Sequence, residues 1–235
     1  ASAEGVRIGI DGLPDHDFMR NEISKLYNLN KGLSYVELYD NINGQYMVPS
    51  TIPQITTIDE DSTVENDIVN DDPGTDILKS QLNEGFPLML YAGHASEISI
   101  TTTGFNVFYY QTLQGMNEVD LGKYFLACFV GCSIGSHDEP YTSLVEQFQI
   151  EKNKGSIAVF GSSILQTWQP PQHMMLKLVD DLAESITNQG TKTIGEMFKS
   201  AVDIDEFKEN GDFYFYHIFG DPVTRYMMTV PEIYN

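Results

Sequence analysis

The sequence predicts an α/β fold built on a mostly parallel sheet with helices on both faces. Three apolar runs, at 86–92, 124–130 and 156–160, have the continuous hydrophobic character of buried parallel strands. They alternate with amphipathic stretches, and this alternation favours a parallel sheet covered by helices. With 235 residues, of which 41% are hydrophobic, the chain is long enough to bury a core without disulfide or metal crosslinks.

The amino-terminal third contains two expected elements and one unusual segment. The amphipathic stretch 17–29 predicts a helix, and 35–39 predicts a short strand. Residues 41–76 carry many carboxylates and three prolines, so we interpret them as an acidic insertion or long loop. Its oxygens could bind a structural Ca²⁺, although the segment lacks EF-hand spacing and a plain acidic loop is the simpler interpretation.

The rest of the chain alternates regularly between helix and strand patterns. Each predicted strand ends in a cluster of small residues, which is typical of turns at the edge of a sheet. The expected elements are a helix at 76–83, a strand at 86–92 ending at Gly93–Glu97, a strand at 124–130 ending at Gly131–Gly135, a helix at 141–152, a strand at 156–160 ending at Gly161–Ser163, and helices at 172–187 and 193–202.

Composition excludes several classes of function. Lys and Arg number 13 against 34 Asp and Glu, a net charge of −21 that argues against binding nucleic acid or anionic membranes. No apolar run approaches the ~20 residues of a membrane-spanning helix. Cys128 and Cys132 are the only cysteines, and their spacing fits neither a zinc knuckle nor a C-x-x-C redox site. The sequence also shows no HExxH motif, no Cys/His cluster and no Gly-rich phosphate loop, so we expect no cofactor for catalysis.

A histidine and a cysteine follow two of the predicted strands. His94 comes after the strand 86–92, and Cys132 comes after the strand 124–130. Because reactive groups gather at the carboxyl ends of parallel strands, we expect the two side chains to meet if the strands are neighbours. The pair suits a cysteine nucleophile with a histidine acid/base, and backbone N–H groups near Ala95 and Cys132 could stabilise an oxyanion.

Each of these residues also has a purely structural interpretation. A buried cysteine at a strand end is often a core residue, and a histidine after a strand is often a hydrogen-bonded turn residue. We expect Cys128, in the middle of its strand, to belong to the core. His137 is the rival base, but it lies close to Cys132 in sequence and is less able to sit across a site from it. His217 is expected to be packed rather than functional.

Five segments, in order along the chain, resemble motifs of the gingipain-type cysteine peptidases. The resemblance implies a caspase-like α/β fold, hydrolysis of peptide bonds, and one catalytic domain over residues 1–235. The segments are Ala1–Gly5, which matches "A-S-A-E-G"; Leu90–Glu97, which resembles "Y-x-G-H-G-S-E"; Val130–Gly135, which resembles "V-A-C-x-x-G"; Gly161–Pro171, which resembles "A-S-T-I-N-Q-S-W-x-S-P"; and Phe219–Pro222, which matches "F-G-D-P".

The resemblance also implies a role for individual residues. Cys132 would be the nucleophile, His94 the general acid/base, and Glu4 the carboxylate that orients the imidazole. The N–H groups of Ala95 and Cys132 would form the oxyanion hole. Three further residues would contact the substrate: Trp168, Gly131 and Ser163. Of these, Trp168 would line the pocket for the residue before the scissile bond.

An acidic residue at the base of this pocket would select Arg or Lys by pairing with its cationic head group. The resemblance places it loosely, on Asp15 or on Asp17. Either residue could instead cap the helix that follows. The resemblance therefore implies a secreted or cell-surface endopeptidase that cleaves proteins or peptides after basic residues.

The sequence also departs from the family pattern. Ala95 replaces a Gly after the histidine, which could alter the oxyanion hole, and Phe129 replaces an Asp before the cysteine motif. The chain opens directly on the first motif, so we expect the amino-terminal strand and subdomain to be missing or to lie on a companion chain or propeptide. Two alternatives remain: a cell-surface processing peptidase or transpeptidase of secreted proteins, and a non-catalytic domain that keeps the fold.

Overall fold

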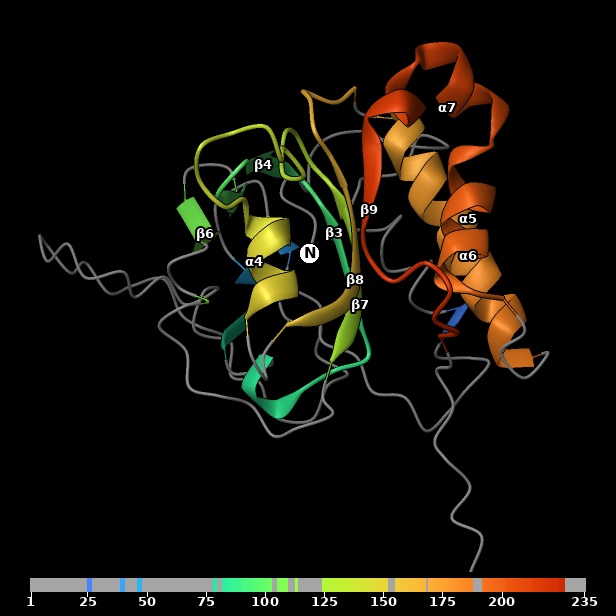
Figure 1. Cartoon of the computed structure of the whole chain (residues 1–235), viewed down its shortest axis with the longest axis horizontal. Helices are drawn as coiled ribbons and strands as arrows, with labels where there is room; N and C mark the ends of the chain where they lie inside the picture. Colours follow the sequence, from blue (N-terminus) through green and yellow to red (C-terminus); the bar gives the residue numbers. More distant parts are fainter. Residues whose placement is uncertain are drawn as a thin grey trace, which may run out of the picture.

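A four-stranded sheet lies at the centre of the molecule in the computed structural model. The structure describes residues 25–26, 39–40, 46–47, 78–79, 82–102, 105–109, 113, 124–151, 155–167, 169–187 and 192–226. The strand order is β3-β7-β8-β9 (Figure 1). Strands β3 (Leu88–Ala92), β7 (Phe125–Val130) and β8 (Ser156–Ser162) are parallel, and β9 (Tyr216–Gly220) joins β8 antiparallel.

The three apolar runs of the sequence are these three parallel strands. Strand β7 is buried at every position, as its uninterrupted apolar run predicts. Alternate residues face opposite sides of the sheet. Leu126, Cys128 and Val130 belong to one hydrophobic core, whereas Ala127 and Phe129 belong to a second core on the other face.

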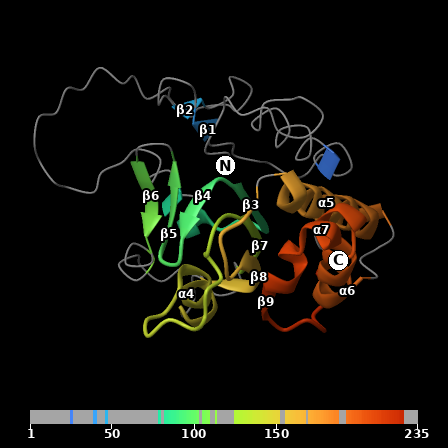
Figure 2. The ribbon, with the colours of Figure 1, turned by 90° about the horizontal axis from the view of Figure 1, so that it is seen from above.

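Helices cover both faces, as the sequence predicts. Helices α5 (Gln169–Thr187) and α6 (Ile194–Val202) lie on one face, and the short helix α4 (Leu144–Ile150) lies on the other (Figures 1 and 2). Helix α7 (Asp205–Asn210) and a 3₁₀ turn (Asp212–Phe215) connect α6 to β9. The mostly parallel α/β architecture is confirmed.

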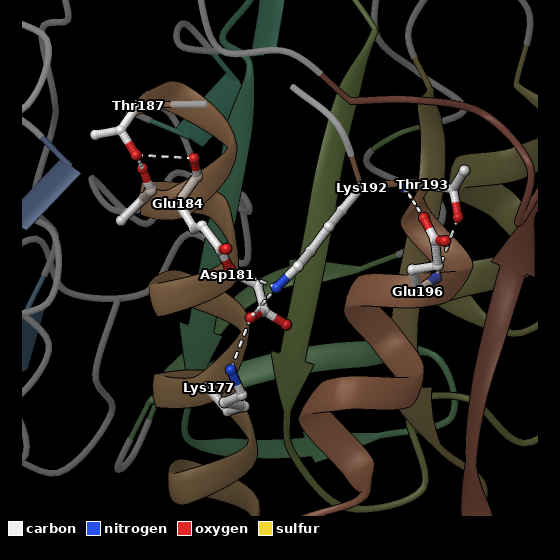
Figure 3. Close-up of polar contacts among 8 residues, drawn as sticks. Lys177, Asp181, Glu184, Thr187, Lys192, Thr193 and Glu196 are labelled. Carbon is white, nitrogen blue, oxygen red and sulfur yellow. Dashed lines mark hydrogen bonds and ion pairs between the residues drawn. The ribbon is translucent and has the colours of Figure 1, made fainter. Parts of the chain in front are cut away.

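Capping residues fix where two of the helices begin. Ser143 accepts the N–H of Glu146 and the Glu146 carboxylate accepts the N–H of Ser143, so α4 begins at Leu144 rather than at the expected residue 141. Thr193 and Glu196 form the same reciprocal pair at α6 (Figure 3). This second helix occupies nearly the range that the sequence predicts.

A second, antiparallel sheet follows β3, where the sequence predicted only a connection. Strands β4 (His94–Ser96), β5 (Ser99–Thr102) and β6 (Phe105–Tyr109) form it in that order (Figure 2). The first strand of this sheet lies within Gly93–Glu97, where the sequence predicts only the end of the preceding strand. These strands are short, and β4 and β5 are rich in Ser and Thr, so they lack the apolar run that marks a buried strand.

The amino-terminal part contributes few described residues. Strands β1 (Tyr39–Asp40) and β2 (Tyr46–Met47) pair antiparallel, so a strand begins inside the range interpreted as an acidic insertion or loop. Lys25–Leu26 is helical, within the expected helix 17–29. Among the described helices, none combines the length and the apolar character that crossing a bilayer requires.

Candidate active site

The ends of β3 and β7 bring the two candidate catalytic residues to one edge of the sheet. Ala92 pairs with Val130 in register, and the N–H of Gly93 donates to the carbonyl of Val130 at 2.9 Å. His94 and Cys132 each lie two residues beyond this last pair. The two strands are neighbours, which is the condition under which the sequence predicts that the two side chains meet, and both residues follow adjacent strand ends.

Gly131 allows the two segments beyond the strands to touch. A Cβ atom added to Gly131 would lie 2.7 Å from the Cβ of Ala95 and 3.2 Å from the carbonyl oxygen of Gly93. Real Cβ atoms do not approach that closely, because the repulsion between atoms rises steeply at such separations. A glycine is therefore required for the cysteine segment to pack against the histidine segment.

The hairpin β4–β5 orients the backbone of Ala95. Ser96 pairs with Ser99 across a two-residue turn, and the pair that closes such a turn is hydrogen-bonded. Because hydrogen-bonded and non-hydrogen-bonded pairs alternate along an antiparallel ladder, the next pair, Ala95 with Ile100, is non-hydrogen-bonded. The N–H of Ala95 therefore points away from β5, along the outer edge of the hairpin. Ala95 also has a negative φ, since Ser133 is the sole non-glycine with a positive φ among the described residues. The alanine at this position introduces no left-handed strain.

Cys132 begins a tight turn held against the end of β8. Its side chain is partly exposed, and its sulfur accepts the backbone N–H of Gln166 at 3.4 Å. The next residue, Ser133, adopts a left-handed φ of 52° and donates its N–H to the carbonyl of Ile164 at 2.8 Å. Gly135 donates to the carbonyl of Ser162 at 2.7 Å. Because the turn is bonded at several points, the backbone that carries the sulfur is held in place.

The second cysteine belongs to the core. Cys128 is fully buried on the face covered by α5 and α6, as the sequence predicts. Burial raises the pKa of the Cys128 thiol far above its ordinary value, because the apolar core disfavours the thiolate. Cys132 is therefore the one accessible thiol of this chain.

Two further histidines lie beside Ser163, a residue that the sequence predicts to contact substrate. Ser163 donates its N–H to the carbonyl of Phe215 at 2.9 Å, and its hydroxyl lies 2.9 Å from Nε2 of His217. The ring of His137 meets the ring of His217 edge to face, with centroids 4.9 Å apart. Burial lowers the pKa of His217, and the nearby His137 lowers it further.

This histidine pair was not predicted as a unit. The sequence suggests only that His217 is packed, and it is half-buried rather than enclosed. His137 and His217 are far apart in sequence and meet because β9 returns antiparallel along β8. No local pattern of residues predicts that return.

Several predicted site residues lie outside the part of the chain that the structure describes: Glu4, Asp15, Asp17 and Trp168. Their roles stay predictions. The two alternatives for 41–76, a plain acidic loop or a segment that binds a structural Ca²⁺, also stay predictions, because only residues 46–47 of it are described. In the described ranges, no group of three or more His, Cys, Asp or Glu side chains could hold a metal ion.

The described geometry supports nucleophilic chemistry. It combines an accessible thiol, an exposed imidazole from the neighbouring strand end, and backbone N–H groups beside them. A thiol activated by an imidazole attacks carbonyl carbon, and N–H donors at the same point stabilise the oxygen that becomes negative.

The sequence of this chain is similar to that of a known family of peptidases. Residues 8–227 match the sequence model of Peptidase family C25. Gingipain R2 and gingipain R1 of Porphyromonas gingivalis are each 25% identical over 153 residues, which is 63% of this chain. Those residues are 21% of gingipain R2 and 15% of gingipain R1, so the chain spans much less than the length of these relatives.

Solved structures share the fold. The crystal structure of the Arg-specific cysteine proteinase gingipain R superimposes with a TM-score of 0.71 and 19% identity, covering 96% of this chain and 46% of that one. A complex of the pro- and mature domains of Porphyromonas gingivalis RgpB gives a TM-score of 0.69 and 18% identity, covering 98% of this chain and 48% of that one.

Proposed function

Because the chain belongs to peptidase family C25, we propose that it is a cysteine endopeptidase in which Cys132 is the nucleophile and His94 the general acid/base. The observation that carries this proposal is the position of the two residues. Each lies two residues beyond the in-register pair Ala92–Val130, on neighbouring strand ends. The close contact between Gly131 and the segment of Gly93 and Ala95 holds the two ends together.

The reaction follows from this arrangement. The Cys132 thiol gives its proton to the imidazole of His94, and the sulfur attacks the carbonyl carbon of the scissile peptide bond. The carbonyl oxygen becomes negative and accepts hydrogen bonds from the N–H groups of Ala95 and Cys132. The tetrahedral intermediate then collapses, His94 protonates the departing amine, and a thioester remains on Cys132.

Water completes the cycle. His94, neutral again, removes a proton from a water molecule that attacks the thioester carbonyl. The carbon–sulfur bond breaks, the acid product leaves, and the proton returns to the sulfur. Glu4 orients the imidazole in this proposal, by analogy with the family motif that it matches. A carboxylate in that position favours the correct tautomer and the transient imidazolium.

We further propose that cleavage occurs after Arg or Lys. The support is the likeness to gingipain R, described as Arg-specific, and the acidic residues Asp15 and Asp17, one of which would meet the guanidinium or ammonium group. Trp168 would line the same pocket, with Gly131 and Ser163 beside the substrate backbone. The net charge of −21 attracts cationic peptides. At physiological ionic strength this attraction is screened beyond a Debye length of ~8 Å.

A direct assay tests the chemistry and the specificity. Fluorogenic peptides with Arg, Lys or a neutral residue before the scissile bond are offered to the reduced protein. We expect cleavage after Arg or Lys that disappears in Cys132→Ala and falls at least about a thousandfold in His94→Ala. Cys128→Ala is the matched control, and it should cleave at nearly the parent rate because Cys128 lies in the core.

Two acidic variants test the pocket separately. Asp15→Ala or Asp17→Ala should lose cleavage after basic residues by at least about tenfold while cleavage after neutral residues persists. If both variants cleave as the parent does, the pocket assignment is wrong. Cleavage by Cys132→Ala, or no cleavage of any peptide by the folded and reduced parent, would contradict the peptidase proposal itself.

We also propose that the protein acts outside the cell or at its surface and that a propeptide accompanies it. The support is the family membership and the likeness to a complex of pro- and mature domains. If the propeptide is removed by the chain's own activity, Cys132→Ala expressed in the natural host should accumulate in a longer form. Normal processing of that variant would show that another peptidase does the cutting.

A further inference from the structure

Gln166 contacts the nucleophile from a distant part of the chain. It lies 34 residues beyond Cys132, in the segment that follows β8, and its backbone N–H donates to the sulfur at 3.4 Å. A hydrogen bond donated to a sulfur atom favours negative charge on that atom. The direction of this one N–H therefore affects how readily the thiol becomes a nucleophile.

The side chain of Gln166 is anchored to a buried hydroxyl. Its amide nitrogen, Nε2, donates to the Oγ of Ser162, a residue with no exposed surface. The other end of the amide, Oε1, is buried and has no hydrogen-bond partner. Among the described residues, the contact with Ser162 is therefore the polar contact that orients this side chain.

The hydroxyl of Ser162 makes all three of the hydrogen bonds that it can form. It accepts the N–H of Ile164 at 3.2 Å, accepts the amide of Gln166, and donates to the carbonyl of Ile164 at 3.2 Å. A hydroxyl has one proton and two lone pairs, so these three contacts satisfy it completely. Ser162 thereby fixes the shape of the turn from residue 162 to residue 166.

The same turn is bonded to the segment that carries the nucleophile. The carbonyl of Ile164 accepts the N–H of Ser133 at 2.8 Å, and the carbonyl of Ser162 accepts the N–H of Gly135 at 2.7 Å. The hydroxyl of Ser136 also donates to the carbonyl of Ser163 at 3.0 Å. With the contact from Gln166 to the sulfur, the turn and the nucleophile segment are thus connected at four points. Such a network holds a functional side chain within a narrow range of geometry.

We propose that Gln166 is a positioning residue for the nucleophile, held by Ser162 so that its backbone N–H stays directed at the sulfur of Cys132. The inference rests on the proposed role of Cys132. Gln166 takes no proton and forms no bond in the reaction. It acts by keeping one backbone donor beside the sulfur before substrate arrives.

Alkylation of Cys132 by iodoacetamide tests this without peptide cleavage. Gln166→Met keeps the length of the side chain but removes the amide, and Ser162→Ala removes the hydroxyl. We expect each variant to react about three- to tenfold more slowly than the parent at pH 7, the effect of one lost hydrogen bond. Because both changes break one network, the double variant should be no slower than the slower single variant.

Controls separate positioning from loss of structure. Leu165→Ala changes the neighbouring side chain of the same turn, which is 76% exposed, and should react at the parent rate. Melting temperatures identify any variant that is unfolded. Ser162 is a core residue, and Ser162→Ala could therefore fail to fold. Gln166 is only partly buried, so Gln166→Met tests the proposal by itself in that case.

The outcomes distinguish the two proposals. If folded Gln166→Met is alkylated at the parent rate, or if the two effects multiply in the double variant, the positioning role is wrong. In active protein, Gln166→Met should lower kcat by the same factor and leave KM unchanged. If alkylation slows as expected but the parent cleaves no peptide, the positioning role stands and the peptidase proposal fails.

Discussion

Gly131 and Ala95 lie so close that a Cβ on Gly131 would be 2.7 Å from the Cβ of Ala95. This contact joins the segment that carries Cys132 to the segment that carries His94. The spacing of the two proposed catalytic residues therefore depends on the absence of a side chain at position 131.

Gly131→Ala should separate the two segments. The added methyl group has no room, so β4 must shift or the turn at Cys132 must distort. We expect a loss of about 1–3 kcal/mol in the free energy of unfolding. Peptidase activity should fall at least about tenfold, because small displacements in a site are costly for catalysis. Urea unfolding and kcat/KM measure the two effects.

Ala95→Gly should rescue that variant. It removes the nearest of the atoms that an added Cβ would meet, the Cβ of Ala95, so Gly131→Ala/Ala95→Gly should recover stability and activity relative to Gly131→Ala alone. The recovery will be partial, because the added Cβ would still lie 3.2 Å from the carbonyl oxygen of Gly93. Equal loss in the single and double variants would show that the contact with Ala95 does not set the spacing.

The two thiols should react very differently with iodoacetamide. Cys132 is partly exposed, whereas Cys128 is fully buried and burial raises the pKa of its thiol. We expect one alkylated cysteine in the folded protein, Cys132, and two after denaturation. Mass spectrometry of peptides identifies the sites. Alkylation of Cys128 at a similar rate in the folded state would contradict its place in the core.

Asp181 should stabilise the protein in a pH-dependent way. Its carboxylate is 1% exposed and accepts Lys177 at 2.7 Å and Lys192 at 2.8 Å (Figure 3). Burial alone would raise the pKa of Asp181, but the hydrogen bonds from the two lysines and from Ser200, with the positive charge of Lys177, outweigh burial and lower the pKa. We expect Asp181→Asn to lose about 1–3 kcal/mol of unfolding free energy at pH 7.

The sign of the pH dependence follows from the lowered pKa. The stabilisation by Asp181 is fully present above its ordinary pKa of 3.8 and is lost as the pH falls through the lower folded value. The difference between parent and Asp181→Asn should therefore shrink below about pH 4. Glu184→Gln is the control: Glu184 also accepts Lys192 but is 52% exposed, so its effect should be small.

His217 should make the protein less stable in mild acid. Burial and then the neighbouring His137 lower the pKa of His217 below its ordinary value of 6.5. The folded state thus favours the neutral ring, so stability is full above pH 6.5 and declines as the pH falls toward the lowered value. His217→Gln should reduce this decline, measured by urea unfolding at several pH values.

The neighbouring histidine offers a graded control. His137→Gln removes one of the two causes that lower the pKa of His217, so its pH dependence should fall between those of the parent and His217→Gln. An acid-side decline in His217→Gln as steep as in the parent would show that other groups produce it.

The sequence by itself determined the central sheet and its covering helices, because apolar runs and helical periodicity are local signals of burial. It also identified His94 and Cys132, because both directly follow apolar runs, where a parallel sheet places its reactive edge. The tertiary structure alone decided what surrounds them. The polar hairpin at Ala95 is formed by neighbouring residues, but it lacks the apolar run that marks a buried strand. The return of β9 that joins His137 to His217 and the contact of Gln166 with the sulfur depend on residues far apart in sequence. Such contacts leave no periodic pattern in the chain, because they arise from the packing of segments that are each unremarkable alone.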